Sequence, residues 1–166
     1  MKRMSMAMAA CVVALSSAHV ALAAGGGGGG GGGDMTPAAA AKPADPEYTS
    51  AVGSIDAGKF ADAKPMLEHV IARDPKNADA YNYLGYVSRK LGDRTAALGF
   101  YGKALEIDPR HLGANEYLGE LYLEMGDLPK AEARLDRLDD LCLFGCPAYT
   151  QLKQAIRSYK DKQPKS

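Results

Sequence analysis

The sequence predicts an all-α protein, built as a short α-solenoid of about three helix pairs and a C-terminal capping helix. Three observations support this prediction. A pattern of small and turn-forming residues recurs with a period of about 34 residues. Within each repeat, apolar residues keep the spacing of one helix face. The chain also has no Trp and three Phe but is rich in Ala and Gly, which suits closely packed helices better than a deep β core.

The first 23 residues have the layout of a secretory signal peptide. Lys2 and Arg3 form a short basic start, an apolar run follows, and Ala-Leu-Ala at 21–23 forms a small-x-small cleavage site. We therefore expect an exported chain that is cleaved near Ala23 and resides in the bacterial periplasm. The alternatives are a buried helix, an uncleaved anchor, and a lipoprotein attached through Cys11, which lies inside the apolar run.

Residues 24–45 are predicted to form a disordered linker. They are mostly Gly, Ala and Pro, and they include an unbroken glycine run from Gly25 to Gly33. Gly-rich chain behaves as a flexible coil and cannot bury enough apolar surface to offset its ordering entropy. A tether and a simple spacer are both consistent with this composition.

The clearest repeat unit runs over 78–111. Its first helical stretch ends at Gly92, which can take the left-handed conformation that terminates a helix. Its second ends at Pro109, which cannot continue a helix. A shift by one period in either direction places Gly58 and Gly126 on Gly92. The predicted array covers 46–144, in units of about 44–77, 78–111 and 112–144.

This pattern resembles the tetratricopeptide repeat, in the form found in small exported bacterial proteins. The positions that match its signature are Leu84, Gly85, Gly92, Ala97, Tyr101, Ala104 and Pro109, with Tyr81 at its usual Trp site. The first unit departs from the signature with Ser50-Ala51 in place of Leu-Gly, and the third has Leu143 in place of Pro. In such repeats Gly85 and Gly119 let the paired helix approach closely, and stacked pairs cover each other's apolar faces.

Residues 145–160 are predicted to cap the open end of the array, followed by a polar tail over 161–166. Pro147 suits a first helical position, with Cys146 before it as N-cap. Leu152 and Ile156 lie on one face of this helix, whose other face is polar. The helix can therefore cover the last pair and present its polar side to water.

Cys142 and Cys146 remain after removal of the predicted signal peptide. Their C-x-x-x-C spacing differs from the C-x-x-C of thioredoxin-type redox motifs, and His69 and His111 lie too far along the chain to complete a metal site. In an exported protein two nearby cysteines favour a disulfide, which would pin the capping helix to the third unit. Free thiols and a redox or metal role are the alternatives.

The sequence predicts no enzyme, with no catalytic residue, no cofactor and no metal site. It contains no H-E-x-x-H motif, no phosphate-binding loop and no G-x-S-x-G motif. His69 is interpreted as a partly exposed helix residue and His111 as a water-facing residue at a repeat junction. Basic and acidic residues number 20 each, which gives no reason to expect nucleic acid as a partner. The body of the chain has no apolar stretch long enough to span a membrane.

The tetratricopeptide resemblance implies that the first helix of each pair lines a concave groove, where another protein or peptide segment binds. The residues it places there are Tyr48, Val52, Asn82, Tyr86, Arg89, Lys90, Glu116, Glu120 and Glu124. The carboxylate-clamp members of the family grip a peptide C-terminus with Lys, Asn and Arg. Glutamates at such positions of the third unit would repel a carboxylate, so we expect a ligand segment with basic character.

Together these observations predict a non-enzymatic protein–protein interaction module, a periplasmic scaffold or adaptor with its partner in the groove. The alternative is a constitutive structural subunit of a cell-envelope assembly, whose convex face is also buried. An enzyme or redox carrier is a third hypothesis, which no motif supports. No pattern in the sequence indicates an oligomeric state or identifies the partner.

Overall fold

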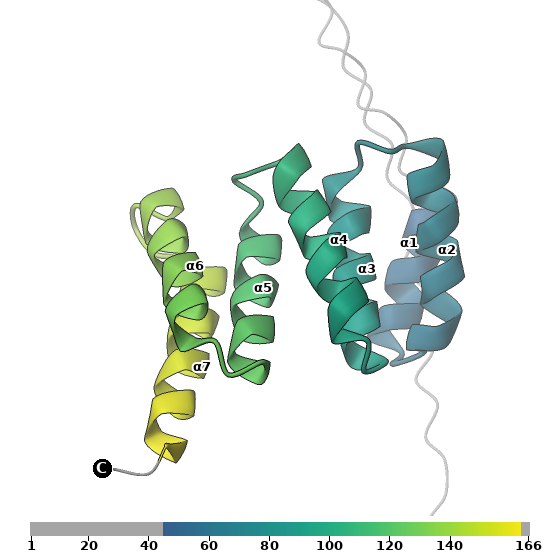
Figure 1. Cartoon of the computed structure of the whole chain (residues 1–166). Helices are drawn as coiled ribbons and strands as arrows, with labels where there is room; N and C mark the ends of the chain where they lie inside the picture. The colour runs from purple at the N-terminus through teal and green to yellow at the C-terminus, as the bar shows by residue number, and fades with distance from the viewer. Residues whose placement is uncertain (1–44, 164–166) are drawn as a thin grey trace, which may run out of the picture. The chain divides into compact units, whose positions relative to one another are not determined.

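The computed structural model describes residues 45–163, and within them it contains seven α-helices and no strand (Figure 1). The helices are α1 (Pro46–Asp56), α2 (Phe60–Arg73), α3 (Ala78–Lys90), α4 (Arg94–Ile107), α5 (Leu112–Glu124), α6 (Leu128–Leu141) and α7 (Pro147–Lys162). The all-α prediction is thereby confirmed. The predicted signal peptide over 1–23 with Cys11, residues 24–44 of the predicted linker over 24–45, and residues 164–166 of the tail lie outside the described residues.

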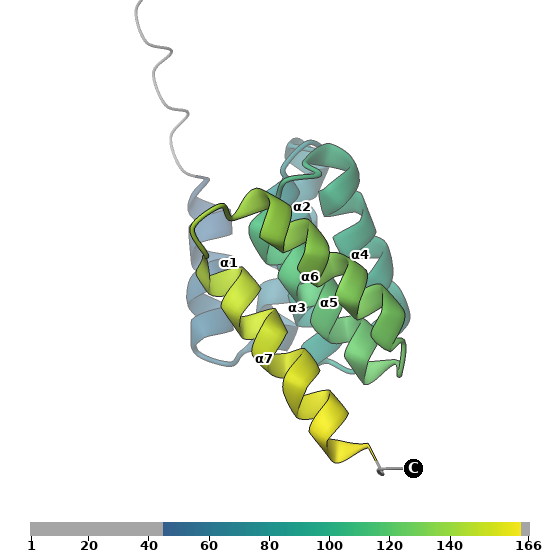
Figure 2. The same ribbon diagram turned by 90° about the vertical axis from the view of Figure 1, so that its left-hand side faces the viewer.

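The helices form two sets with different neighbours. The odd-numbered helices contact one another in succession, α1 with α3, α3 with α5, and α5 with α7. Each even-numbered helix packs between two successive odd-numbered ones, and no two even-numbered helices within 45–163 meet. We call the odd-numbered set the inner helices and the even-numbered set the outer helices; Figure 2 views them from the end formed by α6 and α7. This stacking of pairs is the α-solenoid that the repeat predicts.

The turn inside each pair is made by a glycine in the left-handed region. Gly58, Gly92 and Gly126 have φ angles of 71°, 88° and 78°, which side chains with a Cβ rarely adopt. The next helix then starts with its own cap. Asp93 accepts a hydrogen bond from the Ala96 N–H at 2.9 Å and so satisfies a free donor of the first turn of α4. Glycine therefore recurs once per repeat because each helix pair needs the same tight turn.

Two inner glycines mark the closest helix approaches. A Cβ at Gly85 would lie 2.5 Å from ring atoms of Tyr101 on α4, the second helix of the same pair. At Gly119 the expectation from the sequence is wrong in one respect. The nearest atoms belong to Leu152 of α7, at 2.5 Å from a Cβ, and not to the paired helix α6. The reason is that α7 packs directly against α5 and fills the space that this glycine leaves open.

The capping helix α7 continues the frame of the repeat. Leu84, Leu118 and Leu152 follow one another at the repeat spacing on α3, α5 and α7, and all three are buried. By this register α7 is the first helix of a fourth repeat that has no second helix within 45–163. The position that holds glycine in α3 and α5 holds the exposed Lys153 in α7, so another helix could not approach closely there. The array therefore ends with a polar face, as the sequence predicts for its cap.

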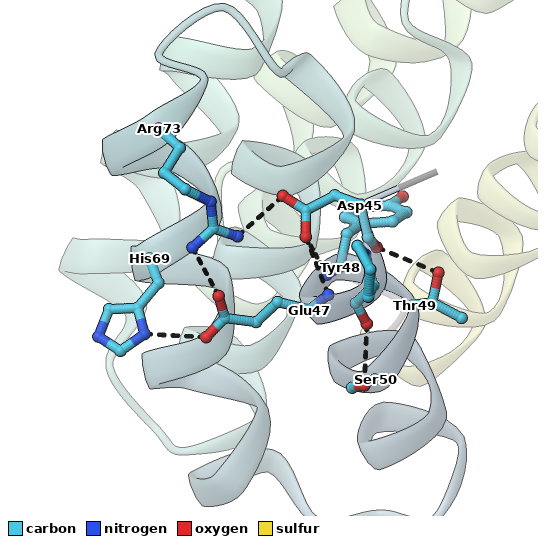
Figure 3. Close-up of polar contacts among 8 residues, drawn as sticks. Asp45, Glu47, Tyr48, Thr49, Ser50, His69 and Arg73 are labelled. Carbon is cyan, nitrogen blue, oxygen red and sulfur yellow. Dashed lines mark hydrogen bonds and ion pairs between the residues drawn. The ribbon is translucent and has the colours of Figure 1, made fainter. Parts of the chain in front are cut away.

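In the first helix pair a polar cluster links α1 to α2 (Figure 3). Asp45 caps α1, since its side chain accepts hydrogen bonds from the N–H groups of Glu47 and Tyr48. From α2, Arg73 donates to Asp45 at 2.8 Å and to Glu47 at 2.7 Å, and His69 Nδ1 lies 2.9 Å from Glu47. The hydrogen bond from Arg73 lowers the pKa of Asp45, and those from His69 and Arg73 lower the pKa of Glu47. This cluster fixes the start of α1 on α2.

Candidate partner-binding surface

The inner helices α3 and α5 contain every buried polar or charged side chain found within 45–163. These residues are Asn82 and Ser88 on α3, and Asn115 and Glu116 on α5. The outer helices bury mainly small and aliphatic residues, with Tyr101 of α4 as the largest. Buried polar groups cost folding free energy unless they are hydrogen-bonded. Asn115 is hydrogen-bonded to His111 and Arg134, whereas Asn82, Ser88 and Glu116 each keep one buried atom without a partner among the described residues.

Arg89 of α3 is the centre of a charged cluster that reaches α5. Its side chain is 7% exposed, donates to Glu120 at 2.8 Å and lies 3.7 Å from a carboxylate oxygen of Glu124. Its guanidinium carbon also lies 5.8 Å from the ring centroids of both Tyr86 and Tyr117, within cation–π range. The cluster ties the second pair to the third through charged and aromatic contacts.

Aromatic rings line the inner helices from α1 to α5. Tyr48 of α1 packs edge-on against Tyr83 of α3, with ring centroids 5.9 Å apart. Tyr86 of α3 lies 5.2 Å from Tyr117 of α5 and 6.0 Å from Phe60 of α2. Burial raises the pKa of Tyr48, Tyr83 and Tyr117, so these phenols stay neutral and can donate hydrogen bonds. Such rings offer apolar contact area with a polar edge.

Asn82 and Glu116 occupy equivalent positions of successive repeats, on α3 and α5. Their side chains are only 5% and 6% exposed. Within the described part of the chain, neither Asn82 Oδ1 nor Glu116 Oε1 has a hydrogen-bond partner. Burial raises the pKa of Glu116 to about 7, an effect to which Glu120 adds and which Arg89 opposes. Two hydrogen-bond acceptors are thus held inside the inner helices without a donor.

The sequence-predicted binding residues all lie on inner helices, but they differ in environment. Tyr86, Arg89, Glu116, Glu120 and Glu124 come together in one region between α3 and α5. Lys90 is exposed at the edge of this region, with its ammonium 5.2 Å from the Tyr86 ring centre. Tyr48 and Val52 lie on α1, where Tyr48 contacts Tyr83 of α3 and Val52 is partly buried. Asn82 and Glu116 lie deeper than the other predicted residues. That they contact a partner stays a prediction.

Tyr83 and Tyr117 are inner-surface residues that the sequence reading missed. They come directly after Asn82 and Glu116 and are themselves equivalent in successive repeats, so the repeat frame contained a signal that could have found them. Their rings contact Tyr48 and Tyr86 and so extend the aromatic surface along the inner helices.

A cavity of about 360 Å³ continues the inner surface between α5 and α7. The residues that line it are Glu120, Leu123, Glu124, Ala155, Ser158, Tyr159 and Lys162. It shares Glu120 and Glu124 with the charged cluster around Arg89. A ligand segment lying on α3 and α5 could therefore extend toward the capping helix.

His111 does not face water as the sequence interpretation expects. It is the N-cap of α5, where its Nδ1 accepts a hydrogen bond from the Ala114 N–H at 3.1 Å. Its Nε2 lies 3.0 Å from Asp79 of α3, and the side chain is 12% exposed. A helix start needs acceptors for its free N–H groups, and an imidazole nitrogen can supply one.

Cys142 and Cys146 lie together at the connection between α6 and α7, with their Cα atoms 5.7 Å apart. This separation fits disulfide geometry. Between them Leu143 and Phe144 are 82% and 100% exposed. Within 45–163 no group of three or more His, Cys, Asp or Glu side chains is placed to hold a metal ion, and no helix is long and apolar enough to cross a membrane.

Stacked helix pairs with a polar and aromatic inner surface define the class of α-helical repeat proteins that interact with other proteins. Two family models, each described as "Tetratricopeptide repeat", match residues 50–111 and 88–156. Between them they cover all seven helices except the first turn of α1 and the last turns of α7. The chain belongs to the tetratricopeptide repeat family.

Curated relatives match only part of the chain. "Uncharacterized protein ycf37" of Pyropia yezoensis is 38% identical over 61 residues, which are 37% of this chain and 34% of that protein. "Probable biofilm formation methyltransferase WspC" of Pseudomonas putida is 33% identical over 82 residues, which are 49% of this chain and 19% of that protein. The chain thus spans about a third or less of the length of these relatives.

Solved structures show the same fold at low identity. The Yersinia enterocolitica type III secretion chaperone SycD, in complex with a peptide of the translocator YopD, has a TM-score of 0.61 at 21% identity, covering 70% of this chain and 91% of that one. The first tetratricopeptide domain of Spaghetti (RPAP3), bound to the HSP90 peptide SRMEEVD, has a TM-score of 0.61 at 15% identity, covering 69% and 93%. Both were solved with a peptide bound.

Proposed function

We propose that the chain is a non-enzymatic scaffold or adaptor that binds a segment of a partner protein on its inner helices. The observation that carries this proposal is the pair of buried, unpaired acceptors at Asn82 and Glu116 beside an aromatic surface. A partner segment can supply the missing donors and cover the rings. Peptide complexes of the structural neighbours support this mode of binding.

The test uses a phage-displayed library of random peptides, selected against the purified chain. Selected peptides bind wild type, and Tyr86→Ala weakens them because this ring belongs to the aromatic surface of the inner helices, where it contacts Tyr117. Asn82→Ala weakens them as well, since it removes an unpaired acceptor. The matched control is Glu106→Ala on the exposed side of the outer helix α4, which leaves binding unchanged. Peptides that bind both inner variants as tightly as wild type contradict the proposal.

The periplasm is the proposed location, and a Cys142–Cys146 disulfide is part of this proposal. The basic and apolar pattern of residues 1–23 supports export, and the close cysteine pair suits an oxidising compartment. By loop-closure entropy such a short bridge stabilises the chain by about 2 kcal/mol. Thiol titration of denatured protein from the periplasmic fraction should find no free thiol. Two free thiols, or retention of the chain in the cytoplasm, would refute this location.

A constitutive structural subunit of an envelope assembly is the second candidate, favoured by one observation. Leu143 and Phe144 are exposed in the connection between α6 and α7. Large apolar side chains so exposed are suited to permanent contact with another protein. In that case a complex from envelope extract would survive Tyr86→Ala and dissociate on Phe144→Ser. The adaptor proposal expects the reverse.

A further inference from the structure

Resting on the proposed peptide-binding function, we propose that the inner helices hold a subsite for one lysine or arginine side chain of the bound segment. Glu116 supplies the anionic acceptor of this subsite and Asn82 a neutral one. The inference concerns ligand chemistry, so it can fail while the inner helices still bind peptides. It follows from three properties of the region between α3 and α5.

The first property is that the two acceptors are buried and unused. Glu116 and Asn82 are each more than nine-tenths buried, and one oxygen of each has no hydrogen-bond partner within residues 45–163. A buried carboxyl group without a donor weakens the folded state. Nearly all buried polar groups of native proteins are paired. A missing donor at both equivalent positions points to one that arrives with a ligand.

The second property is that the terminal nitrogens of the neighbouring cations already have partners, while Nε of Arg89 is buried without one among the described residues. Arg89 directs its terminal nitrogens to Glu120 and Glu124, at 2.8 and 3.7 Å. Arg134 of α6 donates to Asn115 at 3.3 Å, on the residue before Glu116. No side chain of the described residues donates a hydrogen bond to Oε1 of Glu116. Within the described part of the free chain, this oxygen of Glu116 is therefore left without a donor.

The third property is the charge of the surroundings, which selects against anions. Glu116, Glu120 and Glu124 follow one another along α5, one helical turn apart. Arg89 offsets part of this charge but is itself shielded by the rings of Tyr86 and Tyr117. A terminal carboxylate would meet like charge here, whereas an ammonium or guanidinium gains a charge-assisted hydrogen bond. The same rings accept the aliphatic part of a Lys or Arg side chain.

Cation binding at Glu116 is coupled to proton release. Burial holds the pKa of Glu116 at about 7, so at neutral pH a large fraction is protonated in the free chain. A bound cation favours the ionised form, and affinity should therefore rise as the pH increases through about 7. The groups that face it are Arg89 on α3 and Glu120 and Tyr117 on α5, while α7 has neutral Thr150 and Gln154 at the equivalent positions.

The experiment is a parallel selection of the random peptide library against wild type, Glu116→Gln and the outer-helix control Glu106→Gln. Wild type and the control should enrich peptides that share a Lys or Arg at one aligned position. Replacing that residue by Gln should weaken binding to wild type about ten- to one-hundredfold. Glu116→Gln should weaken binding of the parent peptide as much, and the two changes together should cost little more than either alone.

Glu116→Gln keeps the shape of the side chain, so the variant should fold, which its circular dichroism spectrum verifies. The rise of affinity with pH seen for wild type should disappear in this variant. Selection of peptides without a shared basic residue, or unchanged affinity in Glu116→Gln, overturns the cation subsite. If those peptides are still lost on Tyr86→Ala, the proposed function stands without it. If no peptide depends on the inner helices, the proposed function fails first.

Discussion

The inner and outer helices of this array have similar lengths but bury different kinds of side chain. The outer helices α2, α4 and α6 bury a stripe of small and aliphatic residues and keep their charges in water. The inner helices α3 and α5 bury such a stripe too, but they add Asn82, Ser88, Asn115 and Glu116. Only the inner set also contacts itself along the array.

Under the proposed function, this difference separates stability from recognition by helix and not by repeat. Ion pairs on the outside, such as Lys103 with Glu106, are exposed and contribute little to folding. Buried unpaired groups on the inside reduce stability, and a fold that keeps them has a use for them. Chemically similar substitutions on the two sets should therefore differ in their effect on stability.

The largest effect is expected where an inner glycine meets an outer ring. Gly85→Ala should destabilise the chain by about 1–3 kcal/mol, because its Cβ would lie 2.5 Å from the Tyr101 ring, whose buried position leaves little room to move. Urea denaturation followed by circular dichroism measures this loss. Gly119→Ala should act likewise through Leu152 of α7.

The matched control for Gly85→Ala lies on the outer helix α4. Gly102 is exposed inside that helix, and a Cβ there would meet nothing within 4 Å. Gly102→Ala should therefore stabilise the chain, by about 0.5–1 kcal/mol, because Ala favours helix over the unfolded chain. Equal effects of the two substitutions would break the distinction between inner and outer positions.

The next effect concerns Glu116 and the pH. Its pKa is about 7 in the folded chain against 4.5 as the ordinary value. The folded state therefore holds its proton more tightly, and the contribution of Glu116 to stability falls as the pH rises from about 4.5 to 7. At pH values above this window Glu116→Gln should stabilise the free chain by about 1–3 kcal/mol.

Urea denaturation of wild type and Glu116→Gln across this pH range measures the difference. It should vanish at low pH, where the carboxyl is protonated in both states. Glu106→Gln serves as the outer control and should change stability by less than about 0.5 kcal/mol, since its charge is exposed. A Glu116→Gln variant less stable than wild type above pH 7 would show that the buried charge is well paired.

The smallest effect is expected at Tyr101, an outer-helix residue that also buries a polar group. Its hydroxyl is buried without a hydrogen-bond partner among the described residues, yet it lies on α4. Tyr101→Phe removes only this group and should leave stability unchanged or raise it by up to about 1 kcal/mol. A clear loss of stability in the same urea assay would show that the hydroxyl supports Arg89, whose charge reaches it.

The recurrence of Gly58, Gly92 and Gly126 was enough to predict the helix pairs, because a left-handed turn demands glycine and so leaves a mark in the sequence. The contact of Gly119 with α7 was not predictable, since the repeat signature describes a neighbour within the pair. Glu116 was assigned to the groove by its position. Its depth depends on how α3 and α5 pack, which no local pattern encodes.

The register of α7 bears on how such a chain can change in length. Because its leucine continues the spacing of Leu84 and Leu118, one further unit inserted before residue 112 would present the same final pair to the same last helix. Lys153 would still occupy the position at which a closely packed further helix would require glycine. The number of repeats can therefore change by whole units without altering the packing of α7 on the last helix pair. Lys153 then limits close helix packing on α7 whatever the number of repeats.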